Sequence, residues 1–256
     1  MYKVAVCLHG LVGNAIGKSQ EHNKNSREVL ELAYKHWHKH IIRPQTKRDC
    51  QVDFFIHTWS EDLEEDIVRL FNPRAIKTQS QPSFDIPDYV KGEESRKHAH
   101  YCRWYSNKES VDLKSAHENE NGFIYDCVMC ARFDIAWQKK IIFKKHDQKQ
   151  FWVAKWSTDK PGGKGQKPPT KKCKDFWWFS SSKNINKFAK LYYRLDEYNK
   201  PKNASINKKL GVSNHFLMSY HAKKLKLNFG LVLESRDNFA NSDFPLIRYH
   251  YFDAKV

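Results

Sequence analysis

The feature that most constrains the fold is an alternation of strand-like and helix-like segments along the first half of the chain. A β-rich run at 2–8 leads through a glycine turn and a polar loop into a helix, which Ser26 caps. "QVDFFIHTWS" (51–60) is typical of a second strand, and the acidic stretch after it predicts a short helix that ends at Pro73. Strands alternating with helices predict an α/β fold, a mostly parallel central sheet flanked by crossover helices.

The helix predicted from Ser26 to about residue 42 has a clear apolar stripe. Its expected buried residues recur at helical spacing and are Val29, Leu30, Leu32, Ala33, Trp37 and Ile41.

Further elements follow. We expect a short strand in "RAIKTQ" (74–79), a long helix ending near Gly122 and a strong strand in "FIYDCVMCARFDIAW" (123–137). Later strands are expected at 141–145, 150–156, 175–182, 227–237 and 247–252, and later helices at 182–199 and 213–225. The length of 256 residues allows one large domain or two small ones, and we predict a single domain over 1–256.

Composition indicates the kind of partner. Hydrophobic residues make up 40% of the chain, which is ample for a core, and the net charge is +16. Such a charge favours anionic partners: nucleic acid, an acidic membrane surface or phosphorylated small molecules. A genome that favours lysine codons would give the same charge without any function. Much of the excess lies after residue 138, including a Pro-, Gly- and Lys-rich stretch at 157–174 that predicts a mobile loop.

The cysteines and the apolar runs indicate a cytoplasmic protein. The N-terminal apolar run is too short for a signal peptide, and no stretch approaches the length of a membrane span. Cys127 and Cys130 form a C-x-x-C inside a predicted strand, where their side chains would face opposite sides of the sheet. We therefore expect reduced, buried cysteines rather than a zinc site.

Gly17-Lys18-Ser19 resembles the end of a phosphate-binding loop. That loop requires G-x-x-x-x-G-K-[ST], and here Val12 stands where the first glycine belongs. The helix that should follow at once is delayed by several polar residues. The spacing therefore argues against a triphosphate loop, although Lys18 could still contact a phosphate.

Polar residues follow three of the predicted strands. These strand ends are His9-Gly10, His57-Thr58-Trp59 and Arg132-Phe133-Asp134. Ligands of parallel α/β sheets bind outside the carboxyl ends of the strands, so the three ends predict a small-molecule site at one edge.

Asp134 gives the sharpest chemical signal, because a carboxylate at the tip of a buried strand is unfavourable unless it is paired or binds a metal. It could hold Mg²⁺ or Mn²⁺ against a diphosphate, with Arg132 on the same face neutralising the same group. The alternative is an Arg132–Asp134 ion pair that closes the strand.

Four stretches together resemble a known family. They are "KVAVCLHG", "VDFFIHTWS", "WYSNKESVDLKSAHENENGFIYDCVMCARFDIAW" and "DFWWFSSSKNINKFAKLYYRLDEY". In this order they are similar to the small GT-A-type glycosyltransferases of bacterial surface-polysaccharide clusters, large DNA viruses and phages. The resemblance implies a GT-A-like α/β sheet with a smaller mixed C-terminal part. It also implies a nucleotide-sugar-binding half at 1–138 and an acceptor-side half at 139–256, in which the mobile loop would be a lid over the donor.

The resemblance also implies roles for residues. Asp134 would ligate Mn²⁺ or Mg²⁺ on the donor diphosphate, and Arg132, which replaces the first acid of a D-x-D motif, could do part of the metal's work. His250 would be a second metal ligand. The nucleotide would contact the strand-end residues His9, Gly10, His57 and Thr58.

Other positions would complete the site. Ser106 and Lys108, on the helix before the site strand, would reach the diphosphate or the donor sugar, or else are solvated helix residues. Asp175 would face the donor sugar or act as the base on the acceptor hydroxyl. Of Trp177 and Trp178, one would be core and the other a sugar-stacking platform. Asn214 and His215 stand where the family commonly has an acid.

The predicted function is metal-assisted transfer of a hexosyl or similar group from a nucleotide-sugar donor to a glycan or lipid-linked acceptor. Peripheral contact with an anionic membrane is a further possibility that the basic charge allows. The alternatives are a basic nucleic-acid-binding protein without catalysis, which lacks any recognisable binding motif here, and a phosphate- or sulfate-transfer enzyme built on Gly17-Lys18-Ser19.

Overall fold

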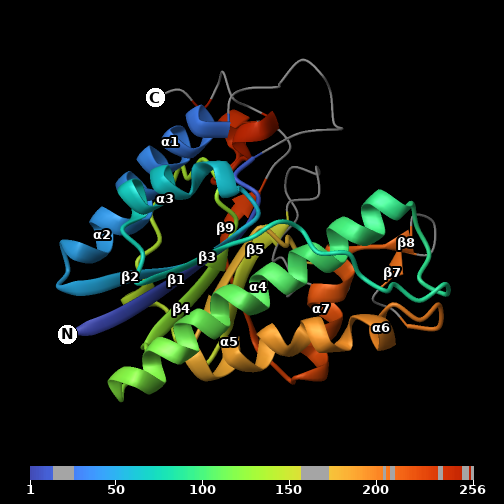
Figure 1. Cartoon of the computed structure of the whole chain (residues 1–256). Helices are drawn as coiled ribbons and strands as arrows, with labels where there is room; N and C mark the ends of the chain where they lie inside the picture. Colours follow the sequence, from blue (N-terminus) through green and yellow to red (C-terminus); the bar gives the residue numbers. More distant parts are fainter. Residues whose placement is uncertain are drawn as a thin grey trace.

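The computed structural model describes residues 1–13, 26–156, 173–203, 206–207, 211–235, 239–249 and 254. Its centre is a seven-stranded sheet with strand order β3-β2-β1-β4-β6-β5-β9, drawn in Figure 1. The strands are β1 (Tyr2–Gly10), β2 (Cys50–Thr58), β3 (Ala75–Thr78), β4 (Cys127–Ala131), β5 (Phe151–Trp156), β6 (Trp177–Ser180) and β9 (Phe229–Ser235). Two further short strands, β7 (Ile206–Asn207) and β8 (Gly211–Val212), form a separate hairpin.

The sheet is mostly parallel, as predicted. β1 pairs in parallel with β2 and β4, and β2 with β3. The direction changes at β6, which runs antiparallel to both β4 and β5, whereas β9 lies parallel to β5. The start of β6 therefore lies at the same edge of the sheet as the end of β4.

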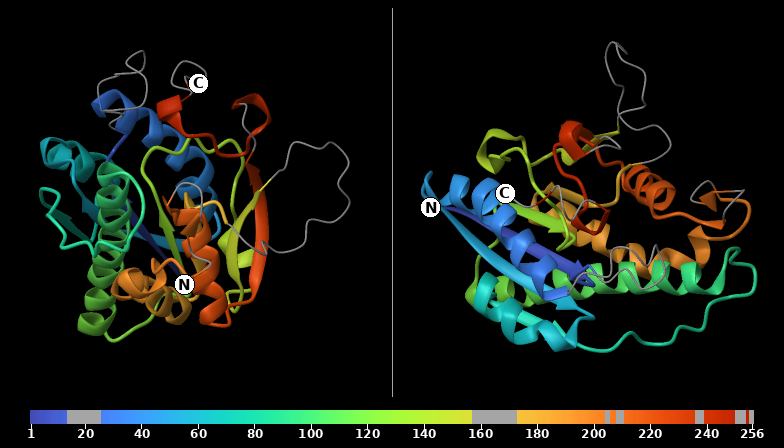
Figure 2. Two further views of the ribbon diagram at one scale, coloured as in Figure 1. Left: turned by 90° about the vertical axis from the view of Figure 1, so that its right-hand side faces the viewer. Right: turned by 90° about the horizontal axis from the view of Figure 1, so that it is seen from above.

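Helices cover both faces of the sheet, as the views in Figures 1 and 2 show. The α-helices are α1 (Ser26–Trp37), α2 (Arg43–Thr46), α3 (Glu64–Phe71), α4 (Glu94–Asn121), α5 (Ser182–Ala189), α6 (Leu195–Tyr198) and α7 (Asn214–Lys224). A π-helical turn, His38–Ile42, follows α1, and 3-10 segments occur at Glu61–Leu63, Phe143–Lys145, Lys190–Arg194, Phe239–Asn241 and Ile247–Tyr249.

Alternate residues of the central strands enter two separate cores. Val4, Val6 and Leu8 pack with α1 and α3, whereas Ala5 and Cys7 pack with α4, α5 and α7. The predicted stripe of the first helix is buried in full. All six cysteines are free and buried, and Cys127 and Cys130 lie in opposite cores, as expected for strand residues three apart.

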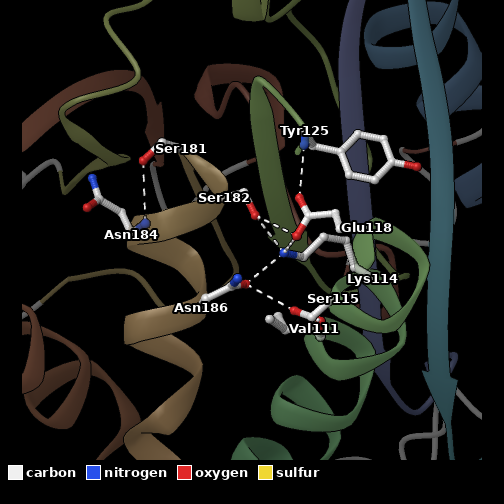
Figure 3. Close-up of polar contacts among 9 residues, drawn as sticks. All are labelled: Val111, Lys114, Ser115, Glu118, Tyr125, Ser181, Ser182, Asn184 and Asn186. Carbon is white, nitrogen blue, oxygen red and sulfur yellow. Dashed lines mark hydrogen bonds and ion pairs between the residues drawn. The ribbon is translucent and has the colours of Figure 1, made fainter. Parts of the chain in front are cut away.

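A closed polar network joins α4 to α5 (Figure 3). The buried Lys114 ammonium donates to Glu118 Oε2, Ser182 Oγ and Asn186 Oδ1 at 2.7, 2.6 and 2.7 Å. Glu118 also accepts from the Tyr125 backbone N–H, just before β4. Because Lys114 and Glu118 each have several partners, the network joins the long helix to α5 and to the start of β4 without leaving either buried charge unpaired.

Two predicted strands are wrong. Residues 141–145 contain the 3-10 segment Phe143–Lys145. The reason is Gln45, whose side-chain amide donates to the Ile141 carbonyl and accepts from the Phe143 N–H, so these backbone groups pair with a side chain instead of a strand. The described part of 247–252 is the 3-10 segment Ile247–Tyr249, in which the Ile247 N–H donates to the Asp134 carbonyl.

The strong strand predicted over 123–137 is shorter than expected. β4 ends at Ala131, and the Ile135 N–H then donates to the Phe133 carbonyl at 2.8 Å, which turns the chain at Asp134. Ile135 forms only an isolated bridge with Leu246. The apolar pattern continues because the segment remains buried, although the strand itself has ended.

Candidate active site at the carboxyl edge of the sheet

The ends of β1 and β2 lie side by side. His9 pairs in register with His57, and Gly10 with Thr58, so both histidines emerge on the α4 face of the sheet. The Thr58 hydroxyl donates to the Gly10 carbonyl at 2.9 Å. The sheet register therefore brings together these four strand-end residues.

Ser106 of α4 contacts the ends of both β1 and β2. Its Oγ accepts from the Gly10 N–H at 2.8 Å, donates to the His57 carbonyl at 3.1 Å and lies 2.7 Å from His57 Nδ1. The serine is completely buried. Its contacts make it a positioning residue for the two strand ends rather than a group that faces a ligand.

Asp134 lies beyond the end of β4 and is held by two arginines. Arg132 donates from Nε to Oδ1 at 2.9 Å and from Nη2 to Oδ2 at 3.2 Å. Arg248, from the 3-10 segment Ile247–Tyr249, donates from Nε to Oδ2. The carboxylate side chain is 0% exposed, whereas both guanidinium side chains are partly exposed. The ion pair foreseen as the alternative is present, and a second arginine reinforces it.

Asp175, just before β6, is held in the same way by two different groups. Arg103 Nε of α4 lies 3.1 Å from one carboxylate oxygen, and His215 Nδ1 of α7 lies 2.7 Å from the other. Burial alone would raise the pKa of Asp175, but the charge of Arg103 and the close contact with the His215 ring outweigh it and hold that pKa well below its usual range. Burial lowers the pKa of Arg103 to about 10.

The two pairs form one electrostatic cluster. Asp175 and Asp134 both act on the charge of Arg132, and Arg103 interacts with both carboxylates. Three guanidinium groups thus face two carboxylates, so the cluster keeps a net positive charge. Because its arginines are partly exposed, that charge is available to an anionic ligand.

His9 stands beside this cluster and packs against the Trp178 ring. The side chain is buried, and in the described part of the chain neither ring nitrogen has a hydrogen-bond partner. Burial, together with Arg103 and Arg132, holds the pKa of His9 well below its ordinary value. His57 Nε2 likewise lacks a partner among the described residues, and burial lowers its pKa to about 4. Buried polar atoms of this kind are normally satisfied, so these two indicate a place where a ligand or water binds.

Other predicted site residues lie elsewhere. Lys108 is paired with Glu109 and Asp112 on its own helix and does not join the cluster. Trp177 and Trp178 are both fully buried on opposite faces, so neither is a surface platform for a sugar. His250, Lys18 and residues 157–172 of the predicted lid lie outside the described residues.

Sequence reasoning missed Arg103 and Arg248 and assigned no role to His215. Arg103 precedes Ser106 by almost one helical turn, so a search of the α4 face around that serine could have found it. Arg248 lies two residues before His250, in a segment interpreted as a strand. Nothing local in the sequence pairs either arginine with its aspartate.

The described residues do not complete a metal site. Both oxygens of Asp134 face arginines, and no group of three His, Cys, Asp or Glu side chains in the described ranges is arranged to hold a metal ion. The metal-binding roles of Asp134 and His250 stay predictions.

Comparison with known proteins supports the fold. No protein-family model matches the sequence, and no curated protein matches it. Among solved structures, the nucleoside-diphosphate-sugar pyrophosphorylase from Vibrio cholerae RC9 is similar, with a TM-score of 0.50 and 10% identity over 98% of each chain. At this identity the likeness defines the class of protein by its fold alone: an α/β protein with a mostly parallel sheet between helices. Within the described residues, no helix is long and apolar enough to cross a membrane.

Proposed function

We propose that this protein is a glycosyltransferase that moves a sugar from a nucleotide-sugar donor to a glycan or other acceptor. The observation that carries the proposal is the cluster at the carboxyl edge of the sheet, where three arginines meet two buried aspartates beside His9, whose ring nitrogens have no hydrogen-bond partner among the described residues. The solved structure with a similar fold is named for action on nucleoside-diphosphate sugars, which agrees with a ligand of that class.

The arginines would bind the donor diphosphate. Arg103, Arg132 and Arg248 come from three different parts of the chain and retain partly exposed guanidinium groups. Guanidinium groups bind phosphate oxygens through paired N–H donors, and their charge would stabilise the departing nucleoside diphosphate. Asp134 would then keep two of these arginines in place.

His9 and His57 would contact the nucleotide. Both imidazoles are buried, and their lowered pKa values keep them neutral at pH 7. A neutral imidazole has one donor and one acceptor nitrogen, which suits the base or the ribose hydroxyls better than a phosphate.

The proton of the acceptor would go to the Asp175–His215 pair. Asp175 was predicted as the base, but its strongly lowered pKa makes it a poor proton acceptor. His215 is partly exposed, and its Nδ1 faces the carboxylate at 2.7 Å. With Nδ1–H donated to Asp175, Nε2 could take the proton while the acceptor oxygen bonds to the anomeric carbon and the carbon–oxygen bond to the diphosphate breaks.

A second candidate is nucleotidyl transfer, because the similar solved structure is named a pyrophosphorylase. In that reaction the phosphate of a sugar phosphate attacks the α-phosphate of a nucleoside triphosphate and pyrophosphate leaves. The arginine cluster would suit either leaving group. The two reactions differ in product: glycosyl transfer releases a nucleoside diphosphate and nucleotidyl transfer releases pyrophosphate.

The test begins with binding. Thermal unfolding is followed with UDP-, GDP-, CMP- and dTDP-sugars, with and without Mn²⁺, for the wild type and for Arg132→Gln and Asp134→Ala. Arg69→Gln, which changes an exposed arginine on α3, is the matched control. We expect one nucleotide class to stabilise the wild type and the control but not Arg132→Gln.

The other outcomes are equally informative. Stabilisation that requires both Mn²⁺ and Asp134 would support the predicted metal. Release of pyrophosphate from a nucleoside triphosphate and a sugar phosphate would favour nucleotidyl transfer. If no sugar nucleotide stabilises the protein while DNA or RNA binds at moderate salt, the proposal is wrong and the basic binding protein is favoured.

A further inference from the structure

A second surface pocket lies outside the arginine cluster. It measures about 330 Å³ and opens between the connection that follows β3, helix α4, and the segment from Lys190 to α6, which run side by side in Figures 1 and 2. Its lining residues are Phe84, Asp85, Tyr101, Tyr192, Tyr193 and Asp196. Four aromatic rings and two carboxylates in one pocket are an unusual combination on a chain with a net charge of +16.

Contacts with neighbouring side chains hold the aromatic rings of this pocket in place. The Tyr101 hydroxyl donates to Asp196 Oδ1 at 2.7 Å. Tyr192 packs edge-on against Tyr105 of α4, with 5.3 Å between the ring centroids. Tyr193 packs edge-on against Tyr192, with 5.4 Å between the centroids. Tyr193 is nevertheless 66% exposed, the largest exposed fraction of any tyrosine among the exposed apolar side chains in the described ranges. A ring held at its base and open on its face is a ready contact surface for a ligand.

We propose that this pocket binds a neutral saccharide, as the acceptor subsite of the enzyme. The apolar C–H faces of a sugar ring pack on tyrosine and phenylalanine, and its hydroxyl groups donate to carboxylates, which only accept. Asp85 and Asp196 supply such acceptors at the rim of the aromatic surface. The volume is at the lower end of the range for small-molecule sites, about 300–1,000 Å³, and suits a mono- or disaccharide unit.

A cationic ligand is less favoured, although aromatic rings and carboxylates also attract cations. Lys108 Nζ already lies 5.9 Å from the ring centroids of both Tyr105 and Tyr193. Lys200 Nζ is 5.9 Å from the ring of Tyr89, whose hydroxyl donates to the Asp196 carbonyl. Lys108 therefore already places an ammonium group near Tyr193, the most exposed ring of the pocket, and would repel a second cation there.

A series of edge-on and tilted ring contacts connects the pocket to the candidate active site. His57 contacts Trp59 at 4.6 Å, Trp59 contacts Tyr105 at 5.7 Å, and Tyr105 contacts Tyr192 at 5.3 Å between centroids. Tyr105 of α4 thus contacts both Trp59, which follows β2, and Tyr192 of the pocket. The acceptor role rests on the proposed function, whereas saccharide binding does not.

The experiment measures binding directly. The full chain is applied to an array of immobilised neutral glycans, and the affinity of the best soluble hit is measured by calorimetry for the wild type, Tyr193→Ala, Asp85→Asn and the control Ile124→Ala. Tyr193 and Ile124 are both largely exposed, so neither change should affect folding. We expect at least a tenfold loss of affinity for Tyr193→Ala and a smaller loss for Asp85→Asn, with Ile124→Ala unchanged.

Several outcomes would overturn the proposal. They are no binding to any glycan on the array, binding that Tyr193→Ala leaves intact, and binding of tetramethylammonium that is lost in Tyr193→Ala while no glycan binds. The nucleotide-sugar thermal shift is measured on the same variants. If that shift is absent but glycan binding follows Tyr193, the saccharide pocket stands and only the glycosyltransferase proposal fails.

Discussion

Helix α4 carries two polar clusters that differ in how fully their hydrogen-bonding groups are used. Toward its end, Lys114 and Glu118 form a buried network with α5 in which each charged group has two or more partners, as Figure 3 shows. Earlier on the same helix, Arg103 belongs to a cluster that keeps net positive charge and borders His9, whose ring nitrogens have no hydrogen-bond partner in the described part of the chain. The closed network holds the fold together, whereas the open cluster has the unused capacity that a ligand would fill.

The largest expected effect is on the closed network. Lys114→Met should lower the free energy of unfolding by about 3–5 kcal/mol, because it leaves the buried Glu118 carboxylate without its cation. Denaturant unfolding measures the change, with Lys183→Met on exposed α5 surface as the control. A loss below about 1 kcal/mol would mean that the network is not closed as described.

A pH effect should come from the open cluster and other buried histidines. The pKa values of His57 and His100 are lowered to about 4 by burial, and that of His9 is also well below its ordinary value. The unfolded chain binds these protons near pH 6.5. The free energy of unfolding should therefore be highest above that pH and should fall as the pH drops toward 4. The expected fall is up to about 1.4 kcal/mol per pH unit for each histidine.

This effect is measured by denaturant unfolding between pH 5 and 8. His9→Leu should give a flatter dependence than the wild type, because one of the groups is removed. Asp175 acts in a different pH range, because its pKa is lowered in the folded protein. Its ionised carboxylate contributes to the free energy of unfolding above about pH 4, and this contribution is lost only in stronger acid. A wild-type curve that is flat from pH 7 to 5 would contradict the burial of neutral histidines.

The ligand-binding role of the open cluster should appear as an affinity change. Arg132→Gln should weaken nucleotide-sugar binding at least about tenfold, as expected for the loss of a charge-assisted hydrogen bond. Calorimetry below the unfolding transition separates this effect from lost stability. An equal loss of nucleotide-sugar affinity for Lys114→Met under the same conditions would contradict the proposal that only the open cluster binds the ligand.

His9→Leu sharpens the comparison because its two effects should have opposite signs. Because the His9 ring nitrogens have no hydrogen-bond partner within the described ranges, removing them should leave the free energy of unfolding at pH 7 unchanged or raise it by about 1 kcal/mol. The same change should weaken nucleotide-sugar binding. If the variant is instead destabilised and binds normally, His9 is a packing residue only.

The smallest effect is expected for Lys108→Ala. Since Lys108 is paired with Glu109 and Asp112 away from the cluster, nucleotide-sugar affinity should stay within about twofold of the wild type. A tenfold loss would restore the role predicted for it from the sequence.

The sequence by itself determined the class of fold and the edge at which the candidate site lies. Apolar periodicity within ten to twenty residues predicted the alternating strands and helices, and the polar residues after β1, β2 and β4 identified the edge of the sheet. Such patterns are local, so sequence alone carries them. The same local reasoning failed at 141–145, where a glutamine nearly 100 residues earlier takes the hydrogen bonds that a strand partner would use.

Only the tertiary structure decided which charges meet. Arg248 reaches Asp134 across 114 positions of sequence, and Arg103 and His215 approach Asp175 from two different helices. The pairing of Asp175 depends on the reversal of direction at β6, which places the start of that strand at the carboxyl edge beside β4. Asp134 therefore acquired two arginine partners, and Asp175 a histidine, because long-range packing rather than any motif sets the neighbours of a buried charge.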